Sequence, residues 1–167
     1  PKNTPRTHPR RSKSVIERRR ARIIAIVESL PDSAAVVCGD RNQYLSLEVR
    51  RRRFGYYLDD HHGDARVAIN CKVEPGANQT LVDFAPERFH IPRYLGARGW
   101  VGLWIDLPSI DWDEVESILV DAYRLTAPKL LLKQVASKTN TRQSAIIEPI
   151  RKKVARRLKS NASERGR

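Results

Sequence analysis

The segment from Arg88 to Leu131 constrains the fold of this chain most strongly, because it combines a buried strand with a well-marked helix start. It reads RFHIPRYLGARGWVGLWIDLPSIDWDEVESILVDAYRLTAPKLL. The nearly continuous apolar run from Trp100 to Leu107 is typical of a strand in the middle of a sheet. Asp111 then offers a helix N-cap, and Glu114 completes a capping-box pattern. The segment therefore predicts a turn, a central strand and a packing helix, in that order.

A second helix is predicted near the N-terminus. Ser14 and Glu17 match a capping box, and the apolar residues that follow recur at helical spacing as far as Leu30. Pro31 and Asp32 are expected to end this helix.

Between the two helices the periodicity changes to that of strands. Residues 44–49 alternate between apolar and polar, and residues 54–58 and 67–73 give further strands. A turn is expected at 74–78 and a short helix at 80–87. A helix, an antiparallel sheet of about five strands and a packing helix together form an α+β layout.

The order of elements and aromatic residues in segments 54–62 and 88–131 closely resembles the MmcQ/YjbR family of CyaY-like proteins. The resemblance implies an antiparallel sheet packed by N- and C-terminal helices. Family members are commonly labelled DNA-binding from their double-wing shape, and no catalytic motif accompanies that label. Where relatives often show a Gly-Lys hairpin tip, this chain has four arginines at 50–53, which retain the charge but include no residue that favours positive φ.

The positive charge of the chain is concentrated at its two ends. Residues 1–22 carry nine basic residues and one acidic residue, and residues 133–167 carry eleven basic and two acidic residues. The body between them holds twelve basic and sixteen acidic residues. This distribution indicates a polyanionic partner, with nucleic acid first and an anionic membrane surface second.

Three parts of the chain are expected. Residues 1–13 contain three prolines and no large apolar residue, so they form a disordered basic arm. Residues 14–135 form the MmcQ/YjbR-like domain, and residues 136–167 form a basic, partly helical tail.

We interpret the chain as a non-enzymatic DNA-binding protein that contacts phosphates with little sequence specificity. Phe54, Tyr56 and Tyr57 beside the arginine run suit either the core or stacking on bases. The candidate binding residues come from the expected hairpin tip, the 93–99 turn and the C-terminal helix, and are Arg50, Arg51, Arg52, Arg53, Arg93, Arg98, Arg151, Lys152, Lys153, Arg156 and Arg157.

Several alternatives remain open from the sequence. The chain also suits a protein-interaction module or an RNA-binding module. Tyr94, Trp100, Trp104 and Tyr123 are candidates to line a small-molecule pocket under the Trp100 strand. His61-His62 resembles a metal cluster, but no Cys or His partner recurs at the spacing of a zinc site. No cofactor or metal is therefore expected.

Cys38 and Cys71 are too few for a disulfide framework, and no apolar run is long enough to span a bilayer. Both cysteines are expected to be reduced core residues of a cytoplasmic protein.

Overall fold

The computed structural model describes residues 11–39, 44–61 and 63–136. The helices are α1 (Lys13–Glu28), α2 (Ala77–Phe84), the short 3₁₀ helix η1 (Gly96–Arg98), α3 (Trp112–Arg124) and α4 (Lys129–Ala136). The strands are β1 (Ser33–Cys38), β2 (Tyr44–Val49), β3 (Arg52–Asp59), β4 (Val67–Lys72), β5 (Phe89–His90) and β6 (Trp100–Trp104). The α+β class predicted from the sequence is confirmed.

The strands form one antiparallel sheet in the order β1-β2-β3-β4-β6-β5. The described part of the chain contains six strands, where about five were predicted. The edge strand β5 has only two residues, which is too short to produce a periodic pattern in the sequence. The strand predicted from Trp100 lies at β6, between β4 and β5, so it has a neighbour on each side.

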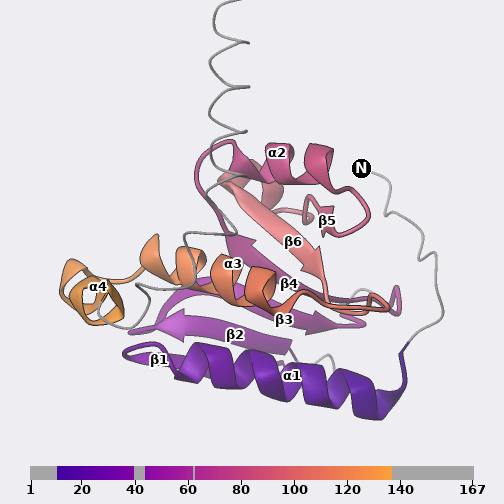
Figure 1. Ribbon diagram of the computed structural model, residues 1–167, viewed down its shortest axis with the longest axis horizontal. Coiled ribbons are helices and arrows are strands. Elements are labelled where there is room, and N and C mark those ends of the chain that lie inside the picture. Colours follow the sequence, from indigo (N-terminus) through magenta and orange to yellow (C-terminus); the bar gives the residue numbers. More distant parts are fainter. Residues whose placement is uncertain (1–10, 40–43, 62, 137–167) are drawn as a thin grey trace, which may run out of the picture.

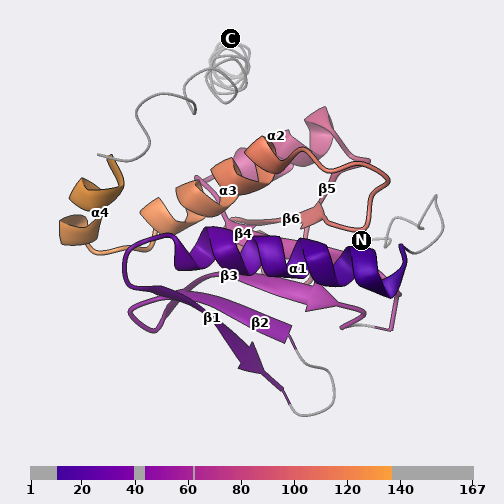
Figure 2. The same cartoon turned by 60° about the horizontal axis from the view of Figure 1, so that its bottom comes forward.

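Helices α1 and α3 cover one face of the sheet and enclose the hydrophobic core (Figures 1 and 2). Alternate residues of each strand point to this face, as the period of two requires. A register shift at Leu47/Glu48 also turns Phe54 toward the core, where its ring meets Tyr123 of α3 edge to face. The opposite side of the sheet is the open face, and α2 lies near its β5–β6 end (Figure 1).

The start of α1 differs from the prediction. The helix begins at Lys13 with Ser12 as its N-cap, and no side chain caps it. Ser14 therefore lies inside the first turn, and the capping box predicted for Ser14 and Glu17 is wrong. Glu17 instead forms an exposed ion pair with Lys13, in which Nζ and Oε1 are 3.9 Å apart.

At the start of α3, the predicted N-cap Asp111 is confirmed, but the predicted capping-box role of Glu114 is wrong. The Asp111 carboxylate accepts hydrogen bonds from the backbone N–H groups of Asp113 and Glu114, both at 3.1 Å. Glu114 does not close a capping box, because its carboxylate accepts two bonds from Nη1 of Arg88 at 2.8 and 2.9 Å. Burial raises the pKa of Glu114, and the nearby Arg88 charge opposes this shift.

Two of the N-terminal arginines have structural partners. Arg19 Nη1 donates to the carbonyl oxygens of Ile105 and Leu107 at 2.6 and 2.7 Å, just beyond the end of β6. The guanidinium of Arg22 lies 4.4 Å from the ring centroid of Trp112, at the start of α3. Part of the basic N-terminal charge therefore stabilises the packing of α1.

Among the described residues, no helix combines the length and apolar character that a bilayer crossing needs.

Candidate nucleic-acid interface

The four arginines at 50–53 form a tight turn between β2 and β3. Val49 pairs with Arg52, which leaves Arg50 and Arg51 as the two central residues. Both have positive φ, at 46° and 63°. This is the left-handed conformation that a type I′ turn requires, and it costs a residue with a Cβ about 1–2 kcal/mol. The tight turn thus forms without the glycine that usually supports it.

Only part of the arginine run faces outward without an acidic partner. Arg50 Nε lies 2.8 Å from the Asp32 carboxylate, and Arg53 Nε lies 3.5 Å from Glu48. Arg51 and Arg52 are exposed and have no acidic partner among the described residues. These two side chains carry the free positive charge of the turn.

The sheet topology brings further cations to the same end of the sheet. Strands β3 and β6 begin at this end and β4 finishes there, with Lys72 paired to Trp100. Arg98 is exposed in η1, directly before β6. We call Arg51, Arg52, Lys72 and Arg98 the basic end. Arg98 therefore lies at the same end of the sheet as the β2–β3 turn, and its role in binding stays a prediction.

The remaining predicted contacts divide into two groups. Arg93 does not belong to the basic end, because it lines a pocket over the open face. The predicted residues of the C-terminal helix, Arg151, Lys152, Lys153, Arg156 and Arg157, lie outside the described residues.

The aromatic residues after the turn have different environments. Phe54 and Tyr57 are 0% and 2% exposed in the core, so stacking on bases is excluded for these two side chains. Tyr56 points to the open face and stacks on Trp100, with ring centroids 5.4 Å apart and an interplanar angle of 27°. Tyr123 also belongs to the core, and its hydroxyl donates to the carbonyl of Pro31 at 3.0 Å.

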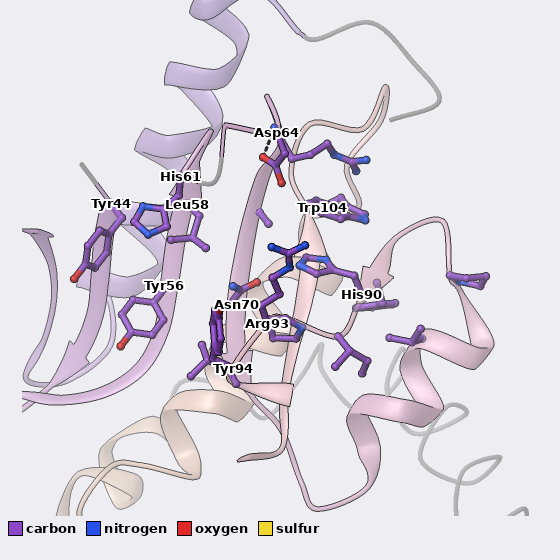
Figure 3. Close-up of a pocket in the computed structure, with 18 residues that line it drawn as sticks. Tyr44, Tyr56, Leu58, His61, Asp64, Asn70, His90, Arg93, Tyr94 and Trp104 are labelled. Atoms are coloured by element: carbon purple, nitrogen blue, oxygen red, sulfur yellow. Dashed lines mark hydrogen bonds between the residues drawn. The ribbon is translucent and has the colours of Figure 1, made fainter. Parts of the chain in front are cut away.

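A pocket of about 470 Å³ lies on the open face of the sheet (Figure 3). The register places Tyr56, Asn70, Gly102 and His90 in one row across β3, β4, β6 and β5. The facing wall comes from the segment 91–95, which includes Arg93 and Tyr94, and from Val82 and Pro86. The predicted pocket under the Trp100 strand corresponds to this site, although Trp104 rather than Trp100 lines it.

One wall of the pocket is a stack of three planar groups. The His90 imidazole lies 3.8 Å from the Trp104 ring, with an interplanar angle of 17°, and the Arg66 guanidinium lies 3.6 Å from the same ring. At these separations the two groups occupy opposite faces of the indole. Gly102 makes room for His90, because an added Cβ would overlap the imidazole.

A buried ion pair between Arg66 and Asp106 lies behind this wall. Arg66 Nε lies 2.9 Å from Oδ2 of Asp106, and the two side chains are 7% and 0% exposed. A buried charge is retained only when it is paired, so this contact holds Arg66 against Trp104.

Asn70 is the polar group at the floor of the pocket. It is 5% exposed, and its Oδ1 has no hydrogen-bond partner among the described residues. Figure 3 shows Asn70 between Tyr56 and His90. Most buried polar atoms have a partner, so an unpartnered oxygen that lines a pocket indicates a place for a ligand donor. Sequence reasoning missed Asn70, whose only signal is a polar residue between Ile69 and Cys71 in an apolar strand.

Of the His61-His62 pair, only His61 lies within the described residues. Its ring packs edge to face on Tyr44, with centroids 5.2 Å apart, at the rim of the same pocket. Within the described ranges, no three His, Cys, Asp or Glu side chains gather closely enough to hold a metal ion.

Comparison with known proteins supports the fold. Residues 28–125 match the family model described as YjbR. No curated protein sequence matches the chain. A solved structure from Deinococcus radiodurans with a DUF419 domain is similar, at 19% identity and a TM-score of 0.52, over 67% of this chain and 83% of that chain. At this identity the likeness concerns the fold alone.

Proposed function

The chain belongs to the YjbR family, and from the charges that its fold leaves facing outward we propose that it is a non-enzymatic nucleic-acid-binding protein. It contacts the phosphates of duplex DNA through the basic end, the N-terminal arm at 1–13 and the C-terminal tail at 136–167, with little base specificity. The observation that carries the proposal is the turn of β2 and β3, where Arg51 and Arg52 are exposed and have no acidic partner among the residues that the structure describes.

The local placement of charge matters more here than the total. Residues 23–132 hold more acidic than basic residues, so the body as a whole does not attract a polyanion. A local excess is therefore needed for a phosphate backbone to approach the folded part. The exposed guanidinium groups meet this need because they pair well with phosphate oxygens.

Several arginines are excluded from this role by their partners. Arg66 and Arg88 are committed to Asp106 and Glu114, and Arg19 is committed to backbone carbonyls after β6. Substituting these three arginines would disturb the fold before it disturbed binding. Within the folded part of the chain, the proposal therefore concerns a small set of outward cations and not basic residues in general.

Fluorescence anisotropy of the full chain with labelled duplex DNA and duplex RNA, across a salt series, tests the proposal. Binding should be present at low salt and should weaken steeply as salt rises, because released counterions drive it. Equal affinity for several unrelated duplex sequences is expected. Absence of binding at low salt would overturn the proposal, and a strong preference for duplex RNA would reassign its substrate.

A further inference from the structure

We infer that the pocket on the open face binds a single nucleobase together with its adjoining phosphate. The base would lie over Asn70, and the phosphate would meet Arg93 at the rim. The choice of a nucleotide over another planar anion rests on the proposed function. The same chemistry is offered by a free mononucleotide and by an unstacked base of a strand held at the basic end.

The floor of the pocket supplies the hydrogen-bonding edge. Asn70 is 5% exposed and lines the pocket, and its Oδ1 lacks a partner among the described residues. A carboxamide has an acceptor and a donor side by side, which is the arrangement that pairs with the edge of a base. An aliphatic ligand would leave this oxygen unsatisfied, so the floor favours a ligand with an N–H group.

The walls of the pocket are suited to a flat ring. Tyr44, Tyr56, His90, Tyr94 and Trp104 all line it, and Figure 3 shows Tyr56 and His90 on opposite sides of Asn70. Bases bind to such surfaces by stacking, and every base has a face that can stack. The volume of about 470 Å³ lies within the usual range of small-molecule sites.

The rim carries a strained and exposed aromatic residue. Tyr94 is 89% exposed and has a φ of 62°, a conformation that is unfavourable for an aromatic residue. A large aromatic side chain gains nothing from exposure to water in the free protein. Strained residues of this kind are often found where a ligand is clamped.

Arg93 brings a positive charge to the pocket, whose other charged lining residues are Asp64 and Arg66. Arg93 is exposed and lines the pocket next to Tyr94. A guanidinium at this position offers paired donors to a phosphate.

The pocket is also connected to the basic end across the sheet surface. Tyr56 at the pocket stacks on Trp100, and Lys72 Nζ lies 6.0 Å from the Trp100 ring. Aromatic and basic groups thus follow one another from the pocket to the end of the sheet. This order of groups resembles the way that single strands are held by other proteins, with stacked bases and a charged track for the backbone.

Titration of the full chain with the four 5′-mononucleotides, followed by intrinsic tryptophan fluorescence, tests the inference directly. Trp104 lines the pocket, so a bound base should change its emission. Asn70→Leu should weaken binding of the preferred nucleotide by about tenfold or more, since a good bidentate contact is lost. The thermal midpoint of Asn70→Leu should not fall, because within the described ranges Oδ1 of Asn70 has no hydrogen-bond partner to lose.

Two surface variants keep the test independent of folding. Tyr94→Ala and Arg93→Gln should each weaken nucleotide binding several-fold, and both side chains are exposed. Arg18→Gln is the matched control for the loss of one charge, because Arg18 is exposed and does not line the pocket, and its helix α1 covers the other face of the sheet (Figure 2). Nucleotide binding should be unchanged in this control.

The outcomes separate the inference from the proposed function. If no mononucleotide and no single-stranded oligonucleotide changes the fluorescence, or if Asn70→Leu, Tyr94→Ala and Arg93→Gln all bind normally, the inference is overturned even when duplex DNA still binds. If mononucleotides bind while duplex DNA does not, the pocket stands and the proposed function fails. Tighter binding of single-stranded oligonucleotides than of mononucleotides, with the same sensitivity to Asn70→Leu, identifies a strand as the source of the base.

Discussion

Arg50 and Asp32 meet through both backbone and side chain. The Arg50 N–H donates to the Asp32 carbonyl oxygen at 3.1 Å, and Arg50 Nε donates to the Asp32 carboxylate at 2.8 Å. Both residues have positive φ, at 46° and 53°. The contact ties the β2–β3 turn to the connection between α1 and β1. Arg50 therefore anchors the turn, and its neighbour Arg51 is left to face outward.

Arg50→Gln should cost stability without a large loss of nucleic-acid binding. The side chains of the ion pair are about half exposed, so the expected loss is under about 1 kcal/mol. The backbone bond to Asp32 remains, and the turn should persist. Thermal unfolding and anisotropy on the same samples measure the two effects. Greater loss of affinity in Arg50→Gln than in Arg51→Gln would contradict this assignment of roles.

Arg51→Asn should stabilise the protein but weaken its binding to DNA, whereas Arg50→Gln should lower stability and leave binding nearly unchanged. Asn tolerates the left-handed conformation better than Arg does, so relief of strain at φ 63° should stabilise the protein by about 0.5–1 kcal/mol. Loss of an exposed guanidinium should at the same time weaken binding to duplex DNA. Denaturant unfolding and a salt series of binding measurements check the two effects. A lower unfolding free energy would show that Arg51 has a stabilising contact that its geometry does not suggest.

Gly102→Ala should disrupt the wall of the pocket. The added Cβ would overlap the His90 ring, so the imidazole would be pushed away from Trp104. Overpacking of this kind costs roughly 1–3 kcal/mol. The cost should be much smaller in a His90→Ala background, and a double-mutant cycle measures that coupling by denaturant unfolding. Equal costs in the two backgrounds would show that another group resists the new methyl.

The two cysteines should differ in reactivity. Burial raises the pKa of the Cys71 thiol to about 12, whereas Cys38 is only partly buried. At pH 8 a thiol reagent should therefore modify Cys38 in the native protein and reach Cys71 only after unfolding. Because the folded state favours the neutral Cys71 thiol, this group's contribution to stability is complete below about pH 8.5 and is lost as pH rises toward 12. Mass spectrometry of labelled native protein checks the order, and rapid labelling of Cys71 would contradict it.

The elements that sequence reasoning predicted well are those whose signals are local. The Asp111 cap depends on backbone groups two and three residues away, and the strand at 44–49 is marked by its own alternation. Glu114 shows where such reasoning stops. Its pattern fits a capping box, but Arg88 from 26 residues earlier lies close enough to take the carboxylate. Only the folded chain brings these two residues together.

The candidate site depends even more on contacts between distant parts of the chain. Nothing in the run of four arginines distinguishes Arg50, which Asp32 neutralises from 18 residues away, from Arg51. The pocket is a row of residues from different strands, including Tyr56, Asn70 and His90, and each looks unremarkable in its own segment. The register of the sheet decides which of them meet.

The most direct test of the central claim is the salt dependence of duplex DNA binding by the full chain and by Arg51→Gln/Arg52→Gln. If about six phosphates are neutralised, the plot of log K against log salt should have a slope near about −5 for the unaltered chain. The double variant should bind several-fold to a hundredfold more weakly, with a slope smaller by about two. Arg18→Gln should lower the affinity for duplex DNA less than Arg51→Gln or Arg52→Gln does alone. An unchanged affinity and slope in the double variant would show that the folded domain does not contact DNA through this turn.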